Sequence, residues 1–95
     1  MTLQELRDKR HEIQEIAAKH GAFRIRVFGS VARGENRPDS DVDFLVEAGP
    51  ATSSWFPAGL ILDLQQVLGH RVEVVEEKAL RPSLRSSVVR DAVPL

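Results

Sequence analysis

The chain contains no cysteine, which excludes disulfide bonds and metal sites built on thiolates. It also lacks an apolar run of about 20 residues, the length that a membrane-spanning helix needs. Its first 20 residues are charged throughout and do not resemble a signal peptide. From these absences we expect a cytoplasmic protein that has no membrane segment.

A strong excess of charge of either sign is also missing. The 13 basic and 14 acidic side chains give a formal net charge of −1. Dedicated nucleic-acid binders are usually clearly basic, and those that bind single strands also stack bases on aromatic side chains. The basic stretches of this chain have no interleaved aromatic residues, so the composition argues against nucleic acid as a partner.

The chain has 95 residues, and its composition of 42% hydrophobic and 28% charged residues is typical of a globular protein. We expect one domain over residues 1–95, because there are no internal repeats and no low-complexity linker. A domain of this size can hold one small ligand and little more. Any second substrate must therefore arrive on a partner protein or at an oligomer interface, and both homo- and hetero-oligomers stay open.

Hydrophobic periodicity predicts alternating helices and strands. Helices are expected at residues 2–19, 30–33 and 57–68 and from Pro82 onward, and strands at 23–28, 41–47 and 71–76. The predicted fold class is therefore α/β (α+β), with a short three-stranded mixed sheet and about four helices packed on it.

Several side chains support these elements. Thr2 and Glu5 have the spacing of a capping box at the start of the first helix. The last helix would place Leu84, Val88 and Ala92 on its inner face. Trp55 and Phe56 are expected to pack in the core where the 57–68 helix begins. The alternative, which the sequence leaves open, is an exposed apolar pair at a partner interface.

The sequence Val-Phe-Gly-Ser at residues 27–30 is typical of a strand that turns directly into a helix. Such a turn exposes unpaired N–H groups at the positive end of the helix dipole, where phosphate binds. Gly29 would let the ligand approach the backbone, Ser30 would add a hydroxyl donor, and Arg33 would add positive charge one turn later. The alternative is a simple strand-to-helix turn with Ser30 as an ordinary N-cap.

Asp41 and Asp43 are separated by one residue on the second predicted strand, so their side chains point to the same face about 7 Å apart. Two carboxylates at this spacing can converge on a hard cation such as Mg²⁺. The alternative is a charged, solvent-facing strand edge. Aspartate is a poor strand former, however, and Leu45 continues the same face, which favours the metal site.

Glu73, on the third predicted strand, is the candidate for a third carboxylate. Three clustered carboxylates would raise one another's pKa unless a cation neutralised them. The alternative is a solvated strand residue paired with Arg71 or Arg24. Taken together, a phosphate-binding turn and a carboxylate cluster indicate phosphoryl or nucleotidyl transfer assisted by two Mg²⁺ ions.

The residues from Gly29 to Gly34 and from Arg37 to Val46 resemble the signature of the DNA-polymerase-β-like nucleotidyltransferase superfamily. The chain is most similar to the minimal nucleotidyltransferases of bacteria and archaea, and the stretches 71–75, 79–82 and 90–93 resemble the remaining parts of these small proteins. This resemblance implies the nucleotidyltransferase fold.

For the site, the resemblance implies metal binding by Asp41 and Asp43, a contact of Ser30 with the triphosphate of ATP, and a place for Ser40 beside the nucleotide. Minimal members are commonly paired with a small helical HEPN protein, often a ribonuclease toxin. Some of these antitoxins transfer AMP from ATP to a tyrosine of the toxin. The size of the chain, which requires an acceptor from outside, agrees with this expectation.

One position departs from the family pattern. The family usually has aspartate where Glu73 stands, and glutamate is one methylene longer. Whether Glu73 acts as the third metal ligand, and whether full two-metal catalysis is possible, therefore stays an open question. A catalytically weak antitoxin that neutralises its partner by binding alone is the main alternative to an AMP-transferring enzyme, and adenylylation of a nucleic acid is a third.

Overall fold

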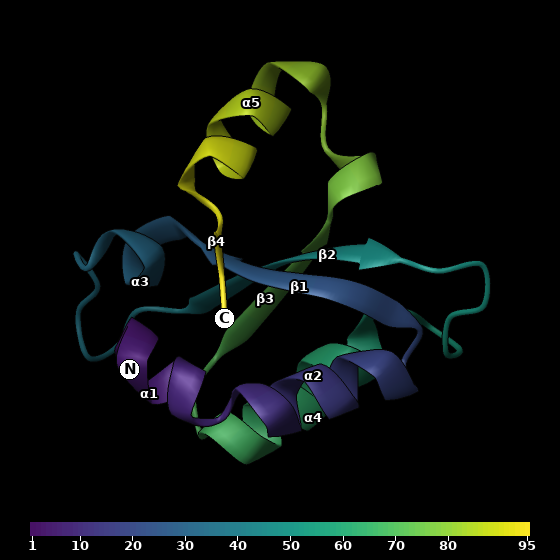
Figure 1. Ribbon diagram of the computed structural model, residues 1–95, viewed down its shortest axis with the longest axis horizontal. Coiled ribbons are helices and arrows are strands. Elements are labelled where there is room, and N and C mark those ends of the chain that lie inside the picture. The colour runs from purple at the N-terminus through teal and green to yellow at the C-terminus, as the bar shows by residue number, and fades with distance from the viewer.

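The computed structural model describes residues 1–95 and is built around one mixed sheet (Figure 1). Its strands are β1 (Ala22–Phe28), β2 (Val42–Ala48), β3 (Val72–Glu76) and β4 (Val93–Pro94). They lie in the order β3-β2-β1-β4, with β1 antiparallel to β2 and β4, and with β2 parallel to β3. The predicted fold class is confirmed, but the sheet has four strands rather than three. The fourth strand was not predicted because two residues are too few to show an alternating pattern.

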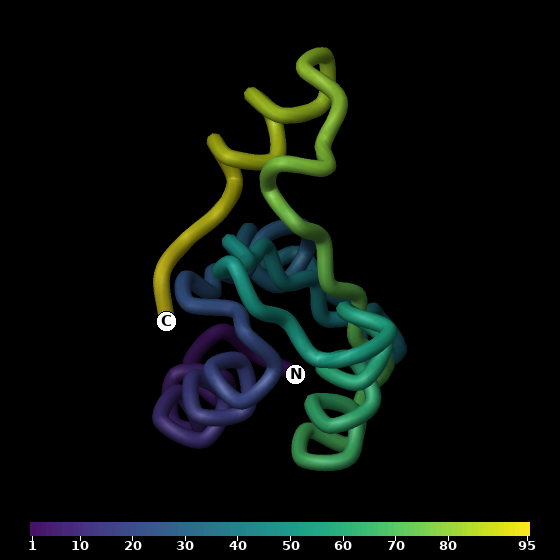
Figure 2. Tube along the Cα trace, turned by 90° about the vertical axis from the view of Figure 1, so that its right-hand side faces the viewer, coloured from purple at the N-terminus to yellow at the C-terminus, as the bar shows by residue number.

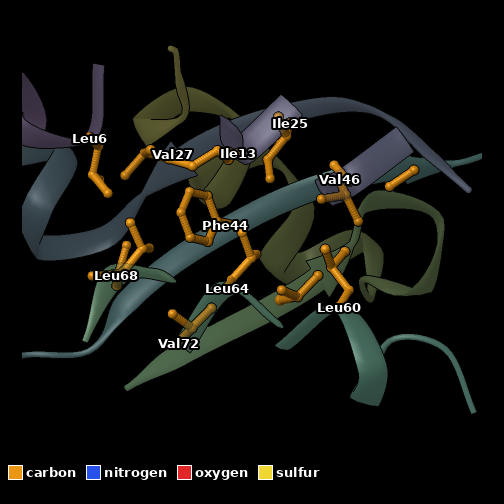
Figure 3. Close-up of a cluster of buried hydrophobic side chains, with 14 of the residues drawn as sticks. Leu6, Ile13, Ile25, Val27, Phe44, Val46, Leu60, Leu64, Leu68 and Val72 are labelled. Carbon is orange, nitrogen blue, oxygen red and sulfur yellow. The ribbon is translucent and has the colours of Figure 1, made fainter. Parts of the chain in front are cut away.

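Three helices cover one face of this sheet: α1 (Leu3–Asp8), α2 (Arg10–Lys19) and α4 (Ala58–Leu68). Figures 1 and 2 both show them on the same side of the strands. The core between the layers contains Val42, Phe44 and Val46 of β2, all of which are fully buried. Figure 3 shows Phe44 and Val46 among the side chains of this core. No helix of the structure has the length and apolar character needed to span a bilayer.

The first predicted helix is divided in two at Lys9, so one continuous helix over 2–19 was wrong. The Lys9 N–H bonds back to the carbonyl of Leu6, three residues earlier, which closes a tight final turn on α1. The Lys9 ammonium donates a hydrogen bond to the carbonyl of Val67 at 3.3 Å, which connects the junction between α1 and α2 to α4. The capping box at Thr2 and Glu5 is present with both of its hydrogen bonds.

The opposite face of the sheet carries the C-terminal part of the chain (Figure 1). Here the 3-10 helix η1 (Glu77–Ala79) leads into α5 (Pro82–Asp91). The prediction for the inner face of this last helix was only partly correct. Val88 and Ala92 are half-buried, but Leu84 is 54% exposed. No residue of α5 is buried.

Trp55 does not lie in the core, contrary to the prediction, because its side chain is 89% exposed. It has a left-handed backbone conformation, with φ of 60°, in the loop before α4. Phe56 is partly buried and packs against the core as predicted. The periodicity could not separate the two residues, because the backbone direction of a loop is not encoded in a repeating pattern.

His20, which is buried, connects this loop to two helices. It ends α2, and its ring nitrogens lie 2.7 Å from the Ser53 hydroxyl and 2.7 Å from the Asp63 carboxylate of α4. Gly59 leaves room for the ring, because a Cβ there would lie 3.0 Å from the His20 Cε1. The ring therefore fixes the 49–57 loop against both α2 and α4.

Replacing His20 with alanine is expected to lower the free energy of unfolding by about 2 kcal/mol, because a cavity forms and two polar groups lose their partner. His11→Ala, at an exposed position of the same helix, is the matched control and should change it by less than about 0.5 kcal/mol. Urea unfolding followed by circular dichroism measures both. Equal effects of the two substitutions would contradict the role of His20.

Candidate active site

The candidate site begins where β1 ends and α3 (Gly29–Arg33) starts without an intervening loop. Gly29 has φ of 75°, a conformation that favours glycine. A Cβ at this position would overlap the Oδ2 atom of Asp43. Glycine therefore allows the turn and the Asp43 carboxylate to occupy adjacent space.

The start of α3 has no side-chain cap, and its N-cap position is Phe28. Ser30 is a residue of the helix itself, so the alternative interpretation of Ser30 as an ordinary N-cap is wrong. The first N–H groups of α3 thus receive no hydrogen bond from a capping side chain. This leaves the backbone donors and the Ser30 hydroxyl at the same end of the helix, as the phosphate-binding interpretation requires.

The pairing of strands places two of the predicted carboxylates side by side. Asp43 of β2 is in register with Glu73 of β3 on one side and with Phe28 of β1 on the other. Asp43 is half-buried and Glu73 is exposed. The end of β1, from which α3 continues, and both carboxylates therefore lie in one row across the sheet.

Asp41 lies just before β2 rather than within it, because the strand begins at Val42, one residue later than predicted. Its Oδ1 atom lies 3.6 Å from the Nε atom of Arg71, the residue that precedes β3. The Arg71 side chain is 84% exposed, so this ion pair is weak and readily replaced. Asp41 remains half-buried beside the Asp43–Glu73 pair.

The pKa of Asp43 reflects its partial burial and the proximity of the other two carboxylates. Partial burial raises the pKa of Asp43 to about 6, and repulsion from Glu73 and then Asp41 adds to the effect. A hydrogen bond with Glu73 contributes in the same direction, whereas Arg33 opposes it. The Asp43 carboxylate is thus less stable as an anion in the protein than in water.

The donor set fits a hard divalent cation, because all three groups are carboxylates and Mg²⁺ prefers oxygen ligands. The side chains are not gathered into a compact cluster of three ligands. A Mg²⁺ ion usually takes one or two protein carboxylates and completes its shell with water and phosphate oxygens. Asp41, Asp43 and Glu73 are therefore suitable ligands at an open site.

Two other predicted nucleotide contacts are occupied by the chain itself. Arg33 forms ion pairs with Glu35 at 3.1 Å and with Asp91 of α5 at 2.9 Å, and these hydrogen bonds raise the pKa of its guanidinium. The Ser40 hydroxyl accepts a hydrogen bond from the Arg37 N–H at 2.8 Å and closes the turn before β2. Both residues belong to segments that adjoin the candidate site. In this structure, however, the guanidinium of Arg33 and the hydroxyl of Ser40 are bonded to other residues of the chain.

The contact of Asp91 with Arg33 could not be predicted from the sequence. This residue ends α5, far along the chain from α3, and only the tertiary structure brings it to Arg33. No local pattern could have identified it, because a single aspartate near the end of a helix is common and carries no spacing signal.

The sequence is similar to one family of known proteins along nearly its whole length. The sequence model of the nucleotidyltransferase domain family matches residues 6–95. A relative in Methanocaldococcus jannaschii, MJ0435, assigned as a protein adenylyltransferase, is 37% identical over 98% of this chain and 97% of its own length. The protein adenylyltransferase MntA of Thermococcus cleftensis is 36% identical over 84% of this chain and 81% of its own length.

Solved structures show the same fold. A structure described as a minimal nucleotidyltransferase superposes with a TM-score of 0.87 at 48% identity, and the match covers 100% of this chain and 97% of that one. A toxin–antitoxin complex with AMP-PNP matches with a TM-score of 0.75 at 22% identity over 88% of this chain and 69% of the other, which shows the shared fold alone. The chain therefore belongs to the nucleotidyltransferase domain family, as one of its minimal members.

Proposed function

We propose that this protein transfers AMP from ATP, with Mg²⁺, to a hydroxyl group on a partner protein and acts as the antitoxin of a toxin–antitoxin pair. The observation that carries the proposal is the row formed by the start of α3, Asp43 and Glu73. The names of the adenylyltransferase relatives and the toxin–antitoxin structures with this fold support it. A HEPN-type helical toxin is the proposed partner.

The chemistry requires one bond exchange at the α-phosphorus of ATP. The acceptor oxygen forms a bond to this phosphorus, the bond to the oxygen bridging to the β-phosphorus breaks, and pyrophosphate leaves with the electron pair. The acceptor hydroxyl gives its proton to solvent. Atoms and charge balance without any further co-reactant.

The residues have separate tasks in this reaction. The uncapped N–H groups of α3 and the Ser30 hydroxyl hold the terminal phosphates. Asp41, Asp43 and Glu73 are the residues that would hold Mg²⁺, which when bound neutralises charge on the phosphate oxygens and on the leaving group. Gly29 keeps the phosphates and the Asp43 carboxylate close to one another. The protein thus contributes position and charge.

Two observations favour an antitoxin that acts by binding alone as the second candidate. Glu73 is exposed, and Arg33 is held by Glu35 and Asp91 rather than aimed at a ligand. Both features are expected to slow catalysis without affecting association. The experiment below separates the two candidates.

Incubation with ATP, Mg²⁺ and the product of the neighbouring gene, which we expect to be a HEPN-type protein, should add one or more AMP units to that product. Intact mass spectrometry measures the gain. Asp41→Asn/Asp43→Asn should abolish it, because the ligands for the cation are lost. The control Glu12→Gln/Glu15→Gln removes two exposed carboxylates of α2 and should leave it unchanged.

Neutralisation of the partner by the Asp41→Asn/Asp43→Asn variant would show that binding alone suffices and would contradict the catalytic account. RNA can be offered as the acceptor in the same assay. A labelled RNA product, with no mass gain on the protein, would assign the activity to nucleic acid instead.

Replacing Gly29 with alanine is expected to lower the transfer rate at least tenfold, because the new Cβ must displace the Asp43 carboxylate. Gly34→Ala is the matched control. Gly34 has a similar φ of 71°, but no atom lies within 4 Å of a Cβ there. Both variants should lose about 1 kcal/mol of stability from the left-handed conformation, and only Gly29→Ala should lose activity.

Steady-state rates at saturating ATP, with thermal melts of both variants, provide the comparison. Equal transfer rates for Gly29→Ala and Gly34→Ala would show that the close approach of Gly29 to Asp43 is not needed for the reaction.

Replacing Asp43 with asparagine should stabilise the metal-free protein while removing activity. The pKa of Asp43 is about 6 in the folded chain against an ordinary value of 3.8, so the folded state binds this proton more tightly than the unfolded state. Wild-type stability therefore falls as the pH rises from about 4 to about 6. At pH 8 in EDTA we expect a gain of about 1 kcal/mol for Asp43→Asn, since water screens part of the repulsion.

Urea unfolding at pH 8 and pH 4 measures this gain, which should largely disappear at pH 4, where Asp43 is protonated in the folded state and partly protonated in the unfolded state. Asp39→Asn, at an exposed turn position, is the control and should have no effect at either pH. A loss of stability for Asp43→Asn at pH 8 would show that the carboxylates do not repel one another in the folded chain.

A further inference from the structure

The C-terminal arm, defined here as residues 77–92, is the least supported part of the fold. It consists of η1 and α5, and none of the ten residues of α5 is buried. An isolated helix of this length is marginal in water and usually depends on a packed face. Leu84, its largest apolar side chain, is 54% exposed. Figures 1 and 2 show the arm rising from the sheet with no other element against its outer side.

The charges of the arm are distinct from those of the whole chain. Its two acidic residues are both engaged, Glu77 with Arg26 at 3.0 Å and Asp91 with Arg33 at 2.9 Å. Its basic residues form no ion pair, and these are Lys78, Arg81, Arg85 and Arg90. The arm is therefore a basic surface on a protein whose net charge is −1.

The arm also carries an open pocket on its surface. A cavity of about 560 Å³ lies between η1 and α5. It is lined by Glu77, Pro82, Arg85, Ser86, Val89 and Arg90. The Glu77 carboxylate already accepts a hydrogen bond from Arg26, which lowers its pKa, so the polar groups left for a ligand are two guanidiniums and a hydroxyl. Such groups recognise carboxylates.

Both ends of the arm are attached to the candidate active site. Arg26, which holds Glu77, is in register with Leu45, two residues along β2 from Asp43. Asp91 is bonded to Arg33 of α3, whose first residues are the proposed phosphate binders. A molecule docked on the arm is thus placed beside the carboxylate row, where an acceptor hydroxyl is needed.

We propose that the C-terminal arm is the docking surface for the acceptor protein, which presents an acidic patch with an apolar centre. Leu84 contacts the apolar centre, Arg81 and Arg85 pair with surrounding carboxylates, and one acidic side chain enters the cavity. This inference rests on the proposed transfer to a partner protein, and it adds the surface and the chemistry by which that partner is recognised.

Charge favours this occupant over two others. A second copy of the chain, docked about a two-fold axis, would bring two basic arms against each other. Single-stranded nucleic acid would require aromatic side chains for base stacking, and the arm has none. The exposed Leu84 fits the apolar centre of a protein interface better than a phosphate backbone.

The test uses charge reversal, Arg81→Glu/Arg85→Glu, with Arg10→Glu/Lys19→Glu on α2 as the matched control at exposed positions. Calorimetry with the HEPN-type neighbour, in EDTA and without ATP, measures docking independently of chemistry. The arm variant should weaken the Kd at least tenfold, and the control should weaken it less than threefold. Leu84→Ser should also weaken it several-fold. Circular dichroism and the Kd for ATP should match wild type, which shows that the fold and the nucleotide site are intact.

With ATP present, the arm variant should raise the KM for the partner and leave kcat unchanged. An unchanged partner Kd in a protein that transfers AMP would overturn the docking proposal alone. A weakened Kd in a system where wild type transfers no AMP would support docking and contradict the proposed function. Loss of RNA binding or of a homodimer, with the partner Kd unchanged, would also overturn the proposal, because the arm would then have a different occupant.

Discussion

Because β2 and β3 run parallel and in register, Asp43 and Glu73 are held side by side although their charges repel each other. The free energy that maintains this pairing comes from the other face of β2, where Val42, Phe44 and Val46 are fully buried against the helices. Side chains of a strand alternate between its faces, so the residues that build the core also fix the direction of the carboxylates. The core therefore supports a cluster of like charges that would not form in a flexible segment.

The start of α3 depends on the same arrangement. Phe28, the last residue of β1, pairs with Asp43, and the helix begins at the next residue. Gly29 has no Cβ, so the carboxylate and the helix start can share a narrow space. The proposed anion-binding donors and the proposed cation-binding carboxylates thus lie next to each other, which is the arrangement that a metal–triphosphate complex requires. The metal and the nucleotide are expected to relieve the repulsion that the fold imposes.

The C-terminal arm is joined to this centre by ion pairs rather than by a hydrophobic core. The Arg26–Glu77 pair is buried, and the Nε atom of Arg26 has no hydrogen-bond partner. Replacing a buried pair by apolar residues often leaves stability unchanged, so this pair determines position more than it adds stability. The Arg33–Asp91 pair is exposed and contributes little energy, yet it connects the arm to α3, the proposed phosphate-binding helix. An arm held in this way can receive a partner without disturbing the sheet.

The sequence by itself determined the fold class, and it predicted the two local parts of the candidate site. The turn at Gly29 and Ser30 and the pair Asp41 and Asp43 were predicted because each depends on neighbouring residues in one strand or one turn. The comparisons confirm the family that these motifs indicated.

Only the tertiary structure decided the remaining features. The register of Glu73 with Asp43, the capture of Arg33 by Asp91 and the two-residue strand β4 all join segments that are distant in the chain. The exposure of Trp55 depends on the path of a loop that is fixed by His20. Periodicity reports which face of an element is apolar, but it contains no information about which other segment will cover that face or pair with it.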